Sequence, residues 1–89
     1  MNRLKKTRKG IDEIDTVILS LIGKRLKLAA DIARIKKSLG LPICQPLREK
    51  EVLSRAARIA KSKGIDEKFT VSIFRAIISH TRKKEKNGK

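Results

Sequence analysis

The sequence has 89 residues, of which 39% are hydrophobic; two are Phe and none is Trp or Tyr. A chain of this length forms one domain at most, and its small core makes association with a second chain a common solution. Because Ile, Leu and Ala dominate the apolar residues while aromatic residues are scarce, we expect an all-α protein.

The charge is strongly basic, with 24 Lys and Arg against 9 Asp and Glu and a formal net charge of +15. Such an excess indicates a polyanionic partner or a small anionic ligand. Residues 1–10 carry five cations and no acid, and residues 81–89 carry five cations and one acid. The two ends therefore hold more than half of the net charge.

Two further observations limit the class of protein. No apolar run approaches the roughly 20 residues that span a bilayer, and no apolar block of a signal peptide follows the basic start, so we expect a soluble, cytoplasmic protein without a membrane partner. The single Cys44 has no second Cys for a disulfide or a zinc site, and we interpret it as a small loop or core residue. No metal site is expected.

The first predicted helix is long and amphipathic, covering about residues 4–39. Its apolar residues recur at steps of three and four, the pattern of a helix with one apolar face. These residues are Ile11, Ile14, Ile18, Leu21, Leu28, Ile32, Ile35 and Leu39. Arg25 occupies the one missing step, Lys36 lies at the edge of the face, and Leu4 and Arg8 extend it upstream.

A helix of this length reaches roughly 54 Å, which is too long for the core of a compact chain of this size. The helices that follow are about half as long and cannot enclose it. We therefore expect a second chain to cover the apolar face. On composition alone, residues 1–10 could instead be a solubilising basic arm.

The second predicted helix covers about residues 46–63. Gly40 and Pro42 end the first helix, and Pro46 suits the first position of the next one. Its inner stripe holds Leu53, Ala56 and Ala60. Gly64 then ends the helix.

The third predicted helix covers about residues 67–85, with Asp66 as its N-cap. Its inward apolar residues are Phe69, Ile73, Phe74, Ile77 and Ile78. The same stripe continues to Thr81 and Glu85, so its last turns are polar.

Arg25 and Lys36 form the core of a candidate anion site. They are eleven residues apart, which on a helix corresponds to about 20° of rotation and roughly 16 Å of length, so the two side chains could bracket a small molecule. An Arg within an apolar face is costly unless its charge is matched. The alternatives are an Arg25 side chain that extends to solvent, or an ion pair with Glu49.

Arg48, Glu49, Thr81 and Glu85 are polar residues on stripes that should face the first helix. Each could singly be a solvated residue near a helix end. Together they indicate a pocket of cations and hydrogen-bonding groups, without a Ser-His-Asp set or a Gly-rich phosphate loop.

Several motifs occur in a specific order along the chain. They are Ile11-Asp12-Glu13-Ile14-Asp15, Leu21-Ile22 with Lys24-Arg25, Ile32-Ala33-Arg34-Ile35-Lys36, Pro42 to Pro46 with Leu47-Arg48-Glu49-Lys50-Glu51, and Ile73-Phe74 with Ile77-Ile78. In this order and spacing, the sequence resembles the all-helical chorismate mutases of the AroQ class over nearly its whole length. The resemblance implies an intertwined homodimer of three-helix chains that forms a six-helix bundle.

The resemblance also implies the site and its chemistry. One chain would supply its pocket residues and the other would supply Arg8, since Arg8 and Lys36 are roughly 42 Å apart on one helix. The implied pocket residues are Arg25, Lys36, Gln45, Arg48, Glu49, Thr81 and Glu85. Gln45 stands where many family members have Asp. The cations would hold the two carboxylates of chorismate, Glu49 would take the ring hydroxyl, and Thr81 would help to bind a carboxylate.

The implied reaction is the rearrangement of chorismate to prephenate in the shikimate pathway, without a cofactor, metal or covalent intermediate. Arg25, Lys36 and Glu85 would be the catalytic residues, with Lys36 and Glu85 facing the ether oxygen where negative charge builds. An ionised carboxylate has no proton to donate, so Glu85 would act in its protonated form.

Two alternatives remain open at this point. A pyruvate lyase acting on isochorismate would share the fold. A basic helical nucleic-acid-binding protein would explain the charge, although aromatic stacking positions and a clear helix-turn-helix spacing are missing, so no specific nucleic-acid partner is expected. Another enzyme of the aromatic pathway is a possible protein partner.

Overall fold

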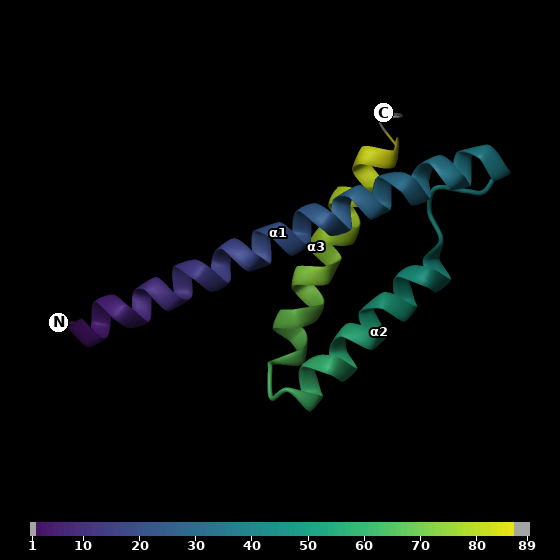
Figure 1. Cartoon of the computed structure of the whole chain (residues 1–89). Coiled ribbons are helices and arrows are strands. Elements are labelled where there is room, and N and C mark those ends of the chain that lie inside the picture. Colours follow the sequence, from purple (N-terminus) through teal and green to yellow (C-terminus); the bar gives the residue numbers. More distant parts are fainter. Residues whose placement is uncertain (1, 87–89) are drawn as a thin grey trace. The chain divides into compact units, whose positions relative to one another are not determined.

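The computed structural model describes residues 2–86, and all regular structure in this range is α-helical (Figure 1). The helices are α1 (Asn2–Leu39), α2 (Pro46–Ser62) and α3 (Glu67–Lys86). The prediction of an all-α chain with one long and two shorter helices is confirmed. The predicted domain of residues 1–89 extends beyond the described residues at both ends. No helix in this range is long and apolar enough to cross a membrane.

The chain divides between Ile32 and Ala33 into two compact units. The first unit is the N-terminal part of α1. The second contains the end of α1, the loop after it, α2 and α3.

Both helix ends in the second unit that precede a loop are closed by glycine. Gly40 has a φ of 70°, its N–H donates to the carbonyl of Lys37 at 3.2 Å, and the N–H of Leu41 donates to the carbonyl of Lys36 at 2.8 Å. This pair of bonds is a Schellman motif, which satisfies carbonyls that a helix end leaves open. Gly64 closes α2 with the same two bonds and the same φ. The predicted stops at both glycines are confirmed.

The starts of α2 and α3 differ in their capping. Pro46 occupies the first position of α2, whereas Gln45 caps the helix without a side-chain hydrogen bond. At α3, an Asp66 carboxylate oxygen accepts from the N–H of Phe69 at 2.8 Å, so the predicted N-cap is confirmed. The short turn between Gly64 and Asp66 thus ends one helix and begins the next with local bonds alone.

Within the second unit, α2 packs against α3. Ala56 and Ala60 on α2 are 7% and 2% exposed and are the only buried apolar side chains in residues 2–86. Their small size limits the apolar area that the helix pair removes from water. Phe69 and Ile73, predicted to face inward on α3, are 59% and 40% exposed, because α2 covers only part of the α3 surface.

The first unit exposes a row of large apolar side chains along α1. Each of them is between 48% and 68% exposed. They are Leu4, Ile11, Ile14, Val17, Ile18, Leu19, Leu21, Leu28 and Ile32. All of them except Leu19 share one broad face of the helix. Soluble monomers rarely expose an apolar surface of this extent, so this face of α1 is a candidate interface.

Replacing Gly64 by Ala should lower the free energy of unfolding by about 1 kcal/mol, because a side chain is strained at positive φ even where space is free. Gly10→Ala is the matched control. Gly10 lies inside α1 and a Cβ there meets nothing within 4 Å, so this change should raise stability by up to about 1 kcal/mol. Urea unfolding followed by circular dichroism at one fixed chain concentration measures both. A Gly64→Ala protein that is as stable as wild type or more stable would contradict the assigned role of Gly64.

Candidate functional site

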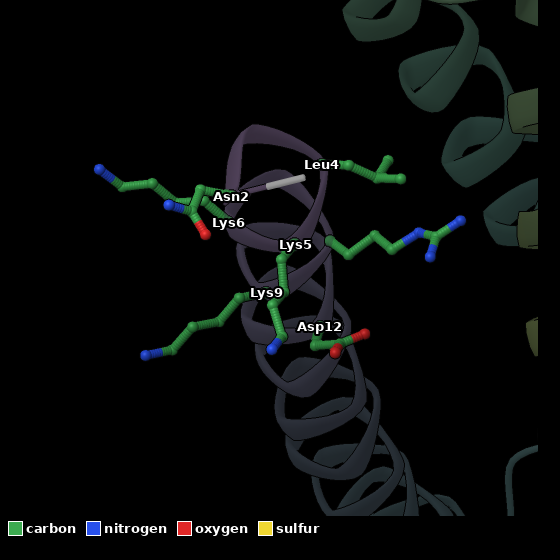
Figure 2. Close-up of a pocket in the computed structure, with 7 residues that line it drawn as sticks. Asn2, Leu4, Lys5, Lys6, Lys9 and Asp12 are labelled. Carbon is green, nitrogen blue, oxygen red and sulfur yellow. The ribbon is translucent and has the colours of Figure 1, made fainter.

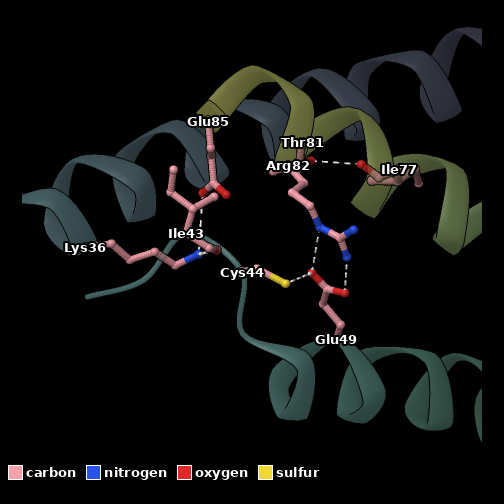
Figure 3. A network of polar contacts seen from close by, with 8 residues as sticks. All are labelled: Lys36, Ile43, Cys44, Glu49, Ile77, Thr81, Arg82 and Glu85. Atoms are coloured by element: carbon pink, nitrogen blue, oxygen red, sulfur yellow. Dashed lines mark hydrogen bonds and ion pairs between the residues drawn. The ribbon is translucent and has the colours of Figure 1, made fainter. Parts of the chain in front are cut away.

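Polar side chains from α1, the following loop, α2 and α3 meet at one end of the second unit (Figure 3). We call this group the polar cluster. Its members are Lys36, Ile43 through its carbonyl, Cys44, Glu49, Thr81, Arg82 and Glu85. Three of the predicted pocket residues of α2 and α3, together with Lys36, therefore lie in one place.

Lys36 and Glu85 form the most sheltered ion pair of the polar cluster. The Nζ of Lys36 lies 3.5 Å from an oxygen of Glu85, and the two side chains are 15% and 9% exposed. The same Nζ donates to the carbonyl of Ile43 at 2.8 Å. An ammonium group has three N–H donors, so one remains for a ligand. The Schellman motif at Gly40 fixes the backbone of Lys36 and of the loop that it contacts.

Glu49 is held by Arg82 through two hydrogen bonds. The Nε of Arg82 donates to Oε2 of Glu49 at 3.2 Å, and a terminal nitrogen of the guanidinium donates to Oε1. The thiol sulfur of Cys44 lies 4.0 Å from Oε2. Neither Arg82 nor Cys44 was among the predicted site residues.

These contacts set the protonation state of Glu49. The hydrogen bonds from Arg82 lower the pKa of the Glu49 carboxyl most, burial opposes them, and the positive charges of Arg82 and Lys36 lower it further. The stability that this pair contributes is present above the ordinary pKa of Glu and is lost as the pH falls through the lowered value. At neutral pH the carboxylate can therefore only accept hydrogen bonds.

The remaining predicted residues of the second unit have different surroundings. The hydroxyl of Thr81 donates to the carbonyl of Ile77 at 2.9 Å, which leaves its oxygen free to accept. Arg48 pairs with Glu51 at 3.4 Å on an exposed surface, where both side chains are more than two-thirds exposed. The structure thus directs Arg48 toward Glu51 rather than into the polar cluster.

Arg8 and Arg25 belong to the first unit. Arg8 contributes to an open hollow on the surface of α1. The other lining residues, labelled in Figure 2, are Asn2, Leu4, Lys5, Lys6, Lys9 and Asp12. A hollow made by one helix cannot enclose a ligand, so a ligand held by Arg8 needs a second element.

The polar cluster offers mainly charged and hydrogen-bonding groups, with the Cys44 thiol beside Glu49. No group of three or more His, Cys, Asp or Glu side chains that could hold a metal ion occurs among residues 2–86. Lys36 presents a donor beside Glu85, and Glu49 presents an ionised acceptor. The chemistry of these groups suits a small molecule that carries both anionic and hydroxyl groups.

Comparisons with known proteins agree with this chemistry. The family model for chorismate mutase type II matches residues 7–86. A chorismate mutase of Methanocaldococcus jannaschii is 42% identical over 97% of this chain and 87% of the relative. A 4-amino-4-deoxychorismate mutase of Streptomyces venezuelae is 38% identical over 88% of this chain and 76% of the relative. A bifunctional chorismate mutase/prephenate dehydratase of Aquifex aeolicus is 41% identical over the whole of this chain, which spans 25% of that protein.

Proposed function

This chain belongs to the chorismate mutase type II family, and we propose that it acts as a single domain of residues 1–89 that rearranges chorismate to prephenate in aromatic amino-acid biosynthesis. The observation that carries the proposal is the sheltered pair of Lys36 and Glu85 beside Glu49, because it supplies donors and an acceptor in one place. The reaction is intramolecular and needs donors at the ether oxygen more than a nucleophile. We propose that no cofactor is required.

Each residue of the site has a proposed role. Lys36 donates its remaining N–H to the ether oxygen. Glu85 donates to the same oxygen in its protonated form, in which it is no longer the anionic partner of Lys36. Negative charge builds on this oxygen as the bond breaks, so both donors bind the transition state more tightly than the substrate. Glu49 accepts from the ring hydroxyl, and Arg25 binds a substrate carboxylate.

Thr81, Gln45 and Arg48 complete the proposed pocket. Thr81 helps to bind a carboxylate, which requires its hydroxyl to turn from the carbonyl of Ile77 toward the ligand. Gln45 is half-buried beside the start of α2 and contacts the ring substituent. Arg48 joins the pocket wall by leaving Glu51, a pair so exposed that its loss costs little.

We further propose that the chain forms an intertwined homodimer of six helices. The exposed apolar side chains along α1 support this, because in a dimer each chain would bury the apolar surface of the other. Arg8 precedes Lys36 by 28 residues in the sequence, which along one helix is too far for both to reach one substrate. The partner chain would therefore donate its Arg8 to the site.

The relatives suggest the setting of the reaction. The Aquifex aeolicus relative combines a chorismate mutase with a prephenate dehydratase, and this supports docking of the present chain to another enzyme of the aromatic pathway. We place the protein in the cytoplasm, where such an enzyme works. The Streptomyces venezuelae relative makes 4-amino-4-deoxychorismate a second substrate to test. Assays of prephenate against pyruvate would separate a mutase from a lyase of the same fold.

Replacing Lys36 or Arg25 by Ala should lower kcat/KM for chorismate by about two orders of magnitude or more, because each removes a charge from the dianionic substrate. Loss of chorismate absorbance measures the rate, and circular dichroism checks the helix content. Lys37→Ala, which removes a neighbouring exposed cation, should leave the rate nearly unchanged. An Arg25→Ala protein that unfolds but keeps its activity per folded molecule would instead make Arg25 structural.

The role of Glu85 as a donor can be tested separately. Glu85→Gln keeps an N–H donor beside Lys36 and should retain most of kcat/KM, whereas Glu85→Ala removes the donor and should lower kcat/KM by about two orders of magnitude. Glu51→Gln, which changes an exposed carboxylate, is the control and should keep the wild-type rate. A Glu85→Ala protein with the kcat/KM of wild type would assign the ether oxygen to another donor.

A further inference from the structure

Arg82 is the one charged residue of the polar cluster without a role in the proposed reaction. It lies on α3 directly after Thr81 and makes both of its hydrogen bonds to Glu49 of α2. The side chains of Arg82 and Glu49 are 41% and 25% exposed. An ion pair that is open to water to this extent adds little to stability, so folding alone does not explain it well.

We propose that Arg82 is a positioning residue that fixes the Glu49 carboxylate and balances its charge, so that the site prefers a neutral ring hydroxyl to a protonated ring amine. This inference rests on the proposed function, in which Glu49 accepts a hydrogen bond from the ring substituent of the substrate. The two competing substrates differ at that position, as the name 4-amino-4-deoxychorismate states.

The geometry of the pair leaves one oxygen available to a substrate. Each carboxylate oxygen has about two acceptor positions. Oε2 receives the Nε–H of Arg82 and lies within 4.0 Å of the Cys44 thiol, whereas Oε1 receives only the terminal N–H of Arg82. Two parallel bonds from a planar guanidinium hold the carboxylate in one orientation. A ring hydroxyl would therefore donate to the second acceptor position of Oε1.

The charges around Glu49 then decide which substituent is accepted. Arg82 approaches from α3, Lys36 acts from α1, and the Cys44 thiol lies in the loop between α1 and α2. Glu49 and Arg82 carry opposite charges and form a pair without net charge. A hydroxyl needs only the acceptor and binds well beside this pair. An ammonium group gains little from it, because it meets the guanidinium as well as the carboxylate.

Removing Arg82 should therefore change substrate choice more than folding. The test measures kcat/KM for chorismate and for 4-amino-4-deoxychorismate at about pH 6, where an aliphatic amine is protonated. Wild type should prefer chorismate. Arg82→Gln should shift the ratio of the two values toward the amine by about tenfold or more, since Glu49 is then an uncompensated anion. Arg75→Gln, an exposed Arg on the same helix, should leave the ratio unchanged.

Two further measurements separate positioning from a structural role. Arg82→Lys keeps the charge but loses the paired hydrogen bonds, so it should keep the preference for chorismate with a lower kcat. As the pH is lowered, kcat/KM for chorismate should begin to fall at a higher pH in Arg82→Gln than in wild type. The reason is that Glu49 is more easily protonated without its partner. A ratio and an acid limb that both match wild type would overturn the inference.

Glu49→Gln provides the test if Arg82→Gln does not fold. It leaves Arg82 uncompensated, so the preference for the hydroxyl over the ammonium group should increase by about tenfold or more among the remaining activity. An unchanged ratio in this variant would also overturn the inference. If wild type converts chorismate and no variant changes the ratio of the two kcat/KM values, the role of Arg82 is refuted but the proposed function is not. A wild type that converts neither substrate refutes the proposed function and this inference together.

Discussion

The exposed apolar face of α1 is the constraint on which the other features depend. Nine large apolar side chains of the first unit are at least 48% exposed, whereas only Ala56 and Ala60 are buried among residues 2–86. A chain of 89 residues buries too little apolar surface to offset the loss of conformational entropy comfortably. Burial of this face against another chain would remove this deficit. In the proposed dimer, the same cover also completes the site, so that stability and activity arise from one interface.

The second unit shows how a strongly basic chain keeps its site residues in place. The net charge of the whole chain is +15, and like charges repel one another, but two of the nine carboxylates lie within the polar cluster. Glu85 pairs with Lys36, and Glu49 pairs with Arg82. Each of these four side chains thus has a partner that orients it before a ligand arrives. Preorganisation of this kind limits the entropy that substrate binding must remove.

Local signals in the sequence were sufficient to predict most of the fold. Gly40 and Gly64 end helices because a left-handed residue closes the Schellman motif, and Asp66 caps α3 through a bond three residues away. Such bonds depend on near neighbours, which a single sequence displays. The exposure of Phe69 and Ile73 was not predicted, because it depends on how much of α3 the small residues of α2 cover.

The pair of Glu49 and Arg82 shows the corresponding limit for the site. The two residues are 33 positions apart, and Arg82 looks like one more cation of a basic C-terminal segment. The sequence does contain an indication of this pair. Glu49 lies 15 residues before the turn at Gly64, and Arg82 lies 18 residues after it. Antiparallel helices joined at that turn bring two such positions to the same end. Lys36, Thr81 and Glu85 were easier to identify, because they continue apolar stripes as polar residues.

Subunit complementation tests most directly whether the site is shared between two chains. Arg8→Ala and Arg25→Ala proteins are each expected to be nearly inactive and to sediment as dimers. After mixing in equal amounts, half of the dimers contain one chain of each kind, and one of their two sites is intact. The account predicts that about a quarter of the wild-type activity returns. No recovery despite subunit exchange verified by native mass spectrometry, or full activity in a monomer, would contradict it.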